Sequence, residues 1–126
     1  MDYLAIVTAL ALLEYMGISI LVGRARVKYG IKAPATTGHE VFERTFRVHQ
    51  NTLEQIVVFL PALWLFGTQV SGGWGALIGM GFIVGRAIYA KGYVADPEKR
   101  GPGFLIGFVA NAVLLIGGLI GALLGG

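Results

Sequence analysis

Two short runs of polar residues carry the side chains best suited to chemistry. The first run places arginine, asparagine and glutamate at spacings of three, four and three residues: Arg44, Arg47, Asn51 and Glu54. The second run repeats this kind of spacing: Arg86, Tyr89 and Tyr93. Residues three and four apart lie on the same face of an α-helix. Each run is therefore expected to form a polar stripe along one helix.

These side chain types suit a small, charged, peptide-like ligand. Guanidinium groups bind carboxylates through paired hydrogen bonds, and a buried glutamate would bind an ammonium group. Asparagine both donates and accepts hydrogen bonds, and tyrosine combines a hydroxyl with an apolar ring. A ligand with two carboxylates and one amine fits, and glutathione is such a molecule. Each residue also has a purely structural interpretation, in which the arginines reach the membrane interface, Glu54 forms a buried ion pair and the tyrosines belong to an aromatic belt.

The composition indicates a membrane protein. The chain has 126 residues, of which 56% are hydrophobic and 13% are charged, whereas a soluble domain has about 25% charged residues. There are no cysteines and two histidines, which excludes disulfides and leaves too few ligands for a metal site. Any thiol chemistry must therefore use a thiol that arrives with a substrate.

The hydrophobic segments predict an all-α fold, an integral membrane four-helix bundle formed by a single domain of residues 1–126. We expect spans at about residues 4–22, 41–66, 74–90 and 104–124. The second span contains the polar stripe and Pro61, which we expect to bend it. At 1.5 Å per residue, Glu54 lies about 18 Å and Arg47 about 28 Å from Phe66. Since the hydrocarbon core is about 30 Å thick, this stripe must face protein or a water-filled cavity.

The basic residues predict the orientation in the membrane. All ten lysines and arginines lie between residues 24 and 47 or between residues 86 and 100. These blocks include the basic residues of the first and third loops, at residues 23–40 and 91–103. The two loops share one side of a four-span protein. The positive-inside rule places both loops in the cytoplasm and both termini on the opposite side. Long apolar runs separate the two blocks, which argues against a nucleic-acid surface.

Further features of the spans concern packing and a rival function. Glycines recur at four-residue spacing: Gly75/Gly79, Gly81/Gly85 and Gly117/Gly121. This spacing favours close helix packing. Glu14 is a single carboxylate within the first span, as in small four-span proton-coupled multidrug transporters. We interpret Glu14 instead as an interhelix hydrogen-bond or ion-pair partner, because such a transporter does not need the arginine-rich stripe.

The sequence resembles the MAPEG family, the membrane-associated proteins in eicosanoid and glutathione metabolism. The resemblance is carried by "FERTFRVHQNTLEQ", "LPALWLFG" and "GRAIYAKGYVADPEKRG", and it covers nearly the whole chain. It is strongest toward the microsomal glutathione transferase branch. The resemblance implies a homotrimer that binds glutathione, as co-substrate, between neighbouring subunits near the cytoplasmic face.

The resemblance also implies residue roles. The residues that match the family's glutathione-binding positions are Arg26, Arg47, His49, Asn51, Glu54, Tyr89 and Tyr93. Arg100 matches the arginine thought to stabilise the thiolate and is the expected catalytic residue. His49 is expected to donate a hydrogen bond to the ligand rather than to act as a general base. His39 is expected to be solvated in a loop.

These matches imply a membrane glutathione S-transferase that adds the thiolate to hydrophobic electrophiles from the bilayer or reduces lipid hydroperoxides. Two departures count against leukotriene synthesis: Val27 replaces an arginine and Gln55 replaces a tyrosine. A non-catalytic, lipid-binding member of the family is an alternative. That branch lacks the residues matching Arg47 and Glu54, and this chain retains both, which favours an enzyme.

Overall fold

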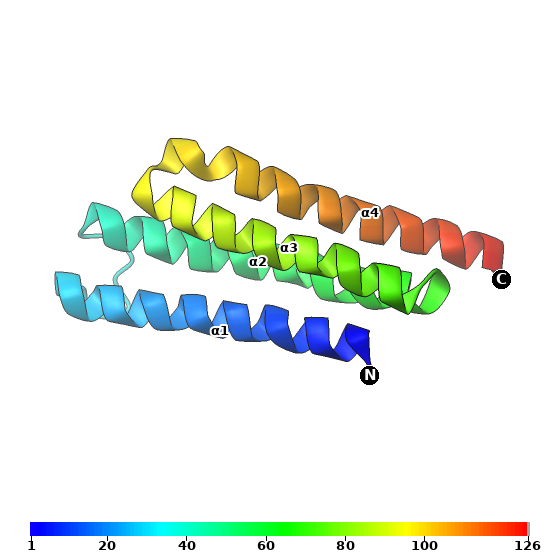
Figure 1. Cartoon of the computed structure of the whole chain (residues 1–126). Coiled ribbons are helices and arrows are strands. Elements are labelled where there is room, and N and C mark those ends of the chain that lie inside the picture. The colour runs from blue at the N-terminus through cyan, green and yellow to red at the C-terminus, as the bar shows by residue number, and fades with distance from the viewer. Residues whose placement is uncertain (126) are drawn as a thin grey trace.

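The computed structural model describes residues 1–125 and confirms the all-α prediction. In this part of the chain four long helices form an antiparallel bundle: α1 (Tyr3–Tyr29), α2 (Glu40–Gln69), α3 (Gly72–Ala95) and α4 (Gly101–Gly125). A short 3₁₀-helix, η1 (Pro97–Arg100), joins α3 to α4. The two termini lie at the same end of the bundle (Figure 1).

Within residues 1–125, three helical segments are long and apolar enough to cross a membrane: Tyr3–Tyr29, Gly72–Ala95 and Pro97–Gly125. Helix α2 is not among them, because its first half is polar, yet it is the longest helix, with 30 residues. It runs through Pro61 without ending. The polar stripe and the apolar half predicted for the second span therefore belong to one continuous helix.

The helix ends follow local capping chemistry. Asp2 and Ser71 accept hydrogen bonds from backbone N–H groups in the first turns of α1 and α3, as helix N-caps do. His39 lies exposed in the loop before α2, as predicted, but it is not only solvated. Its Nδ1 accepts a hydrogen bond from the N–H of Val41 at 3.1 Å, and its ring stacks on Tyr29 with 3.7 Å between centroids. His39 is therefore the N-cap of α2 and attaches its start to the end of α1.

The main core cluster of the bundle takes buried side chains from all four helices. Phe59 and Phe82 stack with 4.0 Å between ring centroids, and both are fully buried. Ala11 and Leu114 bring α1 and α4 against this pair without any exposed surface of their own. The outward faces carry large apolar side chains such as Leu105 and Leu123, as expected for helices that contact lipid.

Close helix packing at the glycines is confirmed, except at Gly81. A methyl group on Gly79 would lie 2.8 Å from Val7 Cγ1, and one on Gly117 would lie 2.8 Å from Phe66 Cε2. The tightest contact with backbone atoms joins α3 to α4, where a methyl group on Gly103 would overlap the backbone nitrogen of Tyr89 and lie 2.8 Å from the carbonyl oxygen of Gly85. A methyl group on Gly81 would meet nothing within 4 Å.

We therefore predict that Gly103→Ala destabilises the protein and Gly81→Ala does not. At Gly103 the added methyl group meets backbone, which cannot rotate away, so the free energy of unfolding should fall by about 2–3 kcal/mol. At Gly81 the change should be neutral or stabilising by up to about 1 kcal/mol, because alanine favours helix. Thermal unfolding followed by circular dichroism in one detergent measures both. Equal melting temperatures for the two variants would contradict the close α3–α4 contact.

Candidate functional site

The candidate site lies at the end of the bundle where α1 ends, α2 begins and η1 joins α3 to α4, which we call the basic end. A pocket of about 390 Å³ opens there between α2, α3 and α4. Its lining comes from four elements: Arg47 and Asn51 of α2, Tyr89 and Tyr93 of α3, Arg100 of η1 and Phe104 of α4. The structure thus brings together five of the eight site residues predicted from the sequence.

The polar side of the pocket presents unused hydrogen-bonding capacity. Asn51 Oδ1 is buried and has no hydrogen-bond partner within residues 1–125. Buried polar atoms in proteins are nearly always paired, so an unpaired one in a pocket wall indicates a position where a ligand donor fits. Arg47 lies one helical turn before Asn51 on α2 and supplies a guanidinium to the same pocket.

The aromatic side of the pocket is built by α3 and α4. The rings of Tyr89 and Tyr93 stack with 5.6 Å between centroids, and the Tyr89 ring tilts against Phe104 at 6.3 Å. The glycine contact at Gly103 permits this approach, because it brings the α4 backbone directly against the backbone of Tyr89. Phe104 was missed from the sequence. The sequence indicates a pocket position for Phe104 only through its place one helical turn after Arg100. Apolar residues are too common in a membrane helix for that spacing to distinguish it.

Arg100 is held at the mouth of the pocket by the turn that precedes α4. Asp96 caps η1 by accepting a hydrogen bond from the N–H of Glu98 at 3.1 Å, and Pro97 begins the helix. Arg100 Nη1 then donates to the carbonyl oxygen of Pro97 at 2.9 Å. The guanidinium remains exposed and keeps its other N–H groups available to a ligand.

Glu54 stands at the side of the pocket rather than in its lining. Its Oε1 lies 3.9 Å from Arg47 Nη1, and the two side chains are 60% and 50% exposed, respectively. The two residues are seven positions apart, so they share the same face of α2 as predicted. Helix α2 thus presents a carboxylate and a guanidinium side by side on an uncovered face.

Arg26 and His49 do not reach the pocket within one chain. Arg26 Nη1 donates to the carbonyl oxygen of Ala35 at 2.8 Å, and its guanidinium lies 4.9 Å from the ring centroid of Phe42. His49 Nε2 lies 2.9 Å from Ser19 Oγ. A single chain therefore does not assemble the complete set of eight residues, because Arg26 lies on α1, His49 faces α1 and Glu54 stands beside the pocket.

Arg44 belongs to the predicted stripe but serves a structural contact. It pairs with Glu40 one turn earlier on α2. Its Nη1 also lies 3.5 Å and 3.4 Å from the carbonyl oxygens of Val94 and Ala95 at the end of α3. Arg44 therefore satisfies the last carbonyl groups of α3, which have no partner within their own helix, and it does not line the pocket.

Arg86 is buried behind the pocket wall. It is 1% exposed, and its Nη2 donates to Thr52 Oγ1 at 2.8 Å. Its guanidinium carbon lies 4.1 Å from the ring centroid of Tyr89. The spacing of Arg86, Tyr89 and Tyr93 predicts one shared face, and the structure places the two tyrosines in the pocket with the arginine beneath them.

Two other polar residues of the spans lie away from the pocket. Asn111 Nδ2 donates to the backbone oxygen of Gln55 at 3.4 Å, so Gln55, the residue that departs from the leukotriene-synthesis pattern, contacts α4. Glu14 is half-buried and, within residues 1–125, forms neither a hydrogen bond nor an ion pair. The predicted interhelix bond of Glu14 is therefore not formed within a single chain.

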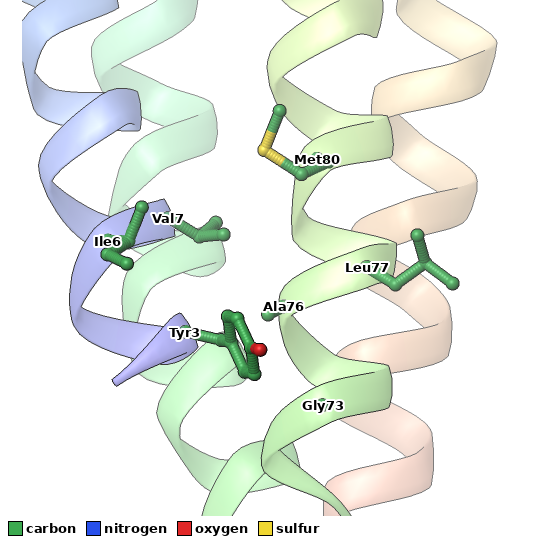
Figure 2. Close-up of a pocket in the computed structure, with 7 residues that line it drawn as sticks. All are labelled: Tyr3, Ile6, Val7, Gly73, Ala76, Leu77 and Met80. Carbon is green, nitrogen blue, oxygen red and sulfur yellow. The ribbon is translucent and has the colours of Figure 1, made fainter. Parts of the chain in front are cut away.

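A second cavity, of about 370 Å³, lies between α1 and α3 near the N-terminus of α1 (Figure 2). Its lining is apolar apart from one phenol hydroxyl: Tyr3, Ile6, Val7, Gly73, Ala76, Leu77 and Met80. A ligand with several charges has no partner there. The pocket at the basic end is therefore the better candidate for a charged ligand.

Comparisons with known proteins identify the family. The family model described as "MAPEG family" matches residues 4–120. Human microsomal glutathione S-transferase 2 is 35% identical over 118 residues, which cover 94% of this chain and 80% of that protein. Leukotriene C4 synthase of Cavia porcellus is 36% identical over 97 residues, covering 77% and 65%. An uncharacterized protein of Synechocystis is 47% identical over 119 residues, covering 94% and 87%.

The bundle, its apolar helices and its polar pocket define a polytopic membrane protein with a polar pocket at one end. The chain belongs to the MAPEG family.

Proposed function

We propose that the protein is a membrane glutathione S-transferase whose site is the pocket at the basic end. The observation that carries this proposal is the convergence of Arg47, Asn51, Tyr89, Tyr93 and Arg100 on one pocket. The guanidinium of Arg47 would bind one carboxylate of glutathione, which leaves Arg100 available to the thiol. The unpaired Asn51 Oδ1 would accept a hydrogen bond from a peptide N–H of the ligand.

The name of one relative, microsomal glutathione S-transferase 2, supports glutathione as the ligand. Microsomal glutathione S-transferase 2 and leukotriene C4 synthase both belong to the same family as this chain. The aromatic wall formed by Tyr89, Tyr93 and Phe104 would place the ligand beside the apolar helices. A hydrophobic co-substrate dissolved in the bilayer would thus meet the ligand without crossing water.

We further propose that the working form is a homotrimer with sites between subunits. Glu54 is 60% exposed in the single chain although it lies at bilayer depth, where a charge facing lipid is costly. Contact with a second copy would cover this face of α2. It would also allow Arg26 and His49 of a neighbouring subunit to complete the pocket that they do not reach in their own chain. The positive-inside rule places the basic end in the cytoplasm.

Arg100 would activate the thiol. A free thiol has a pKa near 8.5 and is only a few per cent thiolate at neutral pH. A guanidinium within hydrogen-bond reach favours the charged form. The thiolate sulfur would then form a bond to an electrophilic carbon as the leaving group departs with its electron pair. For a lipid hydroperoxide, two glutathione molecules would be oxidised to the disulfide while the hydroperoxide is reduced to an alcohol and water.

The decisive experiment is a glutathione titration of the purified protein, followed by the ultraviolet absorbance of the thiolate. Binding should be saturable, and the thiolate absorbance of the complex should persist to lower pH than that of free glutathione, because the bound thiol has the lower pKa. Turnover of an aryl halide in detergent would establish conjugation. Absence of glutathione binding, combined with drug-driven proton release that depends on Glu14, would instead favour a transporter.

A further inference from the structure

Arg86 is a charged residue that the proposed chemistry does not use. It lies within α3 and is almost completely buried, with 1% of its surface exposed. Removing a guanidinium from water costs several kcal/mol, and ionisable residues within spanning helices usually have a function. Its Nε is buried and has no hydrogen-bond partner within residues 1–125. Structural stability alone does not account for such a group.

The contacts of Arg86 connect the two walls of the pocket. Thr52 is fully buried on α2, and its hydroxyl donates to the carbonyl oxygen of Val48 at 2.7 Å. That bond directs the hydroxyl proton away from α3 and leaves a lone pair of Oγ1 to accept from Arg86 Nη2 at 2.8 Å. Thr52 directly follows Asn51 in the chain, so this bond fixes α2 against α3 at the height of the pocket.

The held guanidinium in turn contacts a pocket side chain. It lies 4.1 Å from the ring centroid of Tyr89, within the range of a cation–π interaction. Tyr89 is 3% exposed and lines the pocket. A residue that touches Tyr89 from within the bundle, and is itself fixed to α2, determines where this ring stands relative to Asn51.

We propose that Arg86 is a positioning residue, which Thr52 fixes against the Tyr89 ring so that Tyr89 stands correctly in the glutathione pocket. The glutathione part of this inference rests on the proposed function, whereas the position of Tyr89 does not.

The test compares two buried threonines of α2. Thr52→Val removes the acceptor of Arg86 with little change of shape. Thr45→Val is the matched control, since Thr45 is also buried and its hydroxyl makes the same bond within the helix, to Val41 at 2.8 Å, but it receives none from an arginine. Thr52→Ser restores the hydroxyl. Each full-length variant is labelled with 3-fluorotyrosine, and the ¹⁹F resonance of Tyr89 is assigned by its loss in Tyr89→Phe.

We expect Thr52→Val to shift or broaden the Tyr89 resonance and to raise the Kd for glutathione about tenfold. Thr52→Ser and Thr45→Val should do neither. The double variant Thr52→Val/Arg86→Met removes both partners, so it leaves no unpaired buried charge and should fold even if Thr52→Val alone does not. It should show the same changes as Thr52→Val.

An unchanged Tyr89 resonance in Thr52→Val or in the double variant would overturn the positioning role. Equal effects of Thr45→Val and Thr52→Val would overturn it as well. Failure of the unsubstituted protein to bind glutathione would overturn the proposed function instead. In that case the fluorine spectra alone would still decide whether Arg86 positions Tyr89.

Discussion

Replacing Arg100 by alanine is expected to lower kcat for aryl-halide conjugation about 10²–10³-fold, the usual cost of removing one donor that stabilises a developing anion. Glutathione should still bind, because Arg47 and Asn51 remain in the pocket. The bound thiol should lose its low pKa, so the thiolate absorbance at neutral pH should largely disappear. Stopped-flow absorbance and steady-state kinetics measure the two effects on the same sample.

Lys99→Ala is the matched control for this prediction. Lys99 is the exposed neighbour of Arg100 in η1 and does not line the pocket, so its loss removes one positive charge from the same turn. It should leave kcat within about twofold, since surface charges act weakly through water. Full turnover by Arg100→Ala would show that another group stabilises the thiolate.

Replacing Arg47 by glutamine is expected to weaken glutathione binding about 10–100-fold, the cost of losing charge-assisted hydrogen bonds to one carboxylate. The change also removes the ion partner of Glu54. Isothermal titration calorimetry at constant salt concentration measures the Kd. The kcat of this variant should change much less than its Kd for glutathione, because Arg47 would contact the ligand at a distance from the thiol.

Arg44→Gln provides the comparison on the same helix. Arg44 has the same charge and lies three residues earlier, but its side chain contacts Glu40 and the last carbonyl groups of α3. Its loss should lower the melting temperature and leave the Kd for glutathione nearly unchanged. If both variants weakened binding equally, the effect would come from net charge at the basic end and not from the pocket.

The sequence was sufficient to predict the fold and much of the pocket. The helical spacing correctly grouped Arg47 with Asn51 on α2 and Tyr89 with Tyr93 on α3. Spacing along a helix defines a face, however, and does not show which neighbour that face meets. For this reason Arg44, on the predicted stripe, contacts the end of α3 instead of lining the pocket.

The remaining differences depend on tertiary packing. Arg86 has the spacing of a pocket residue, but the close α3–α4 approach at Gly103 brings the Tyr89 backbone against α4, and the arginine contacts Thr52 in the interior. His49 lies two residues from both Arg47 and Asn51 in the sequence, and two helical steps turn it by about 200° away from them, toward Ser19 on α1. The neighbour that each of these side chains contacts depends on how its helix is rotated about its own axis in the bundle. A single sequence does not specify that rotation.

The ion pair between Arg47 and Glu54 makes this part of α2 electroneutral before any ligand arrives. A net charge at this depth would hinder insertion of the helix into the bilayer, and the pair removes that net charge. A ligand end with one carboxylate and one ammonium group would pair its carboxylate with Arg47 and its ammonium group with Glu54. The net charge of these four groups would remain zero. Because a transmembrane voltage acts on net charge displacement, loading of that end is expected to be independent of membrane potential.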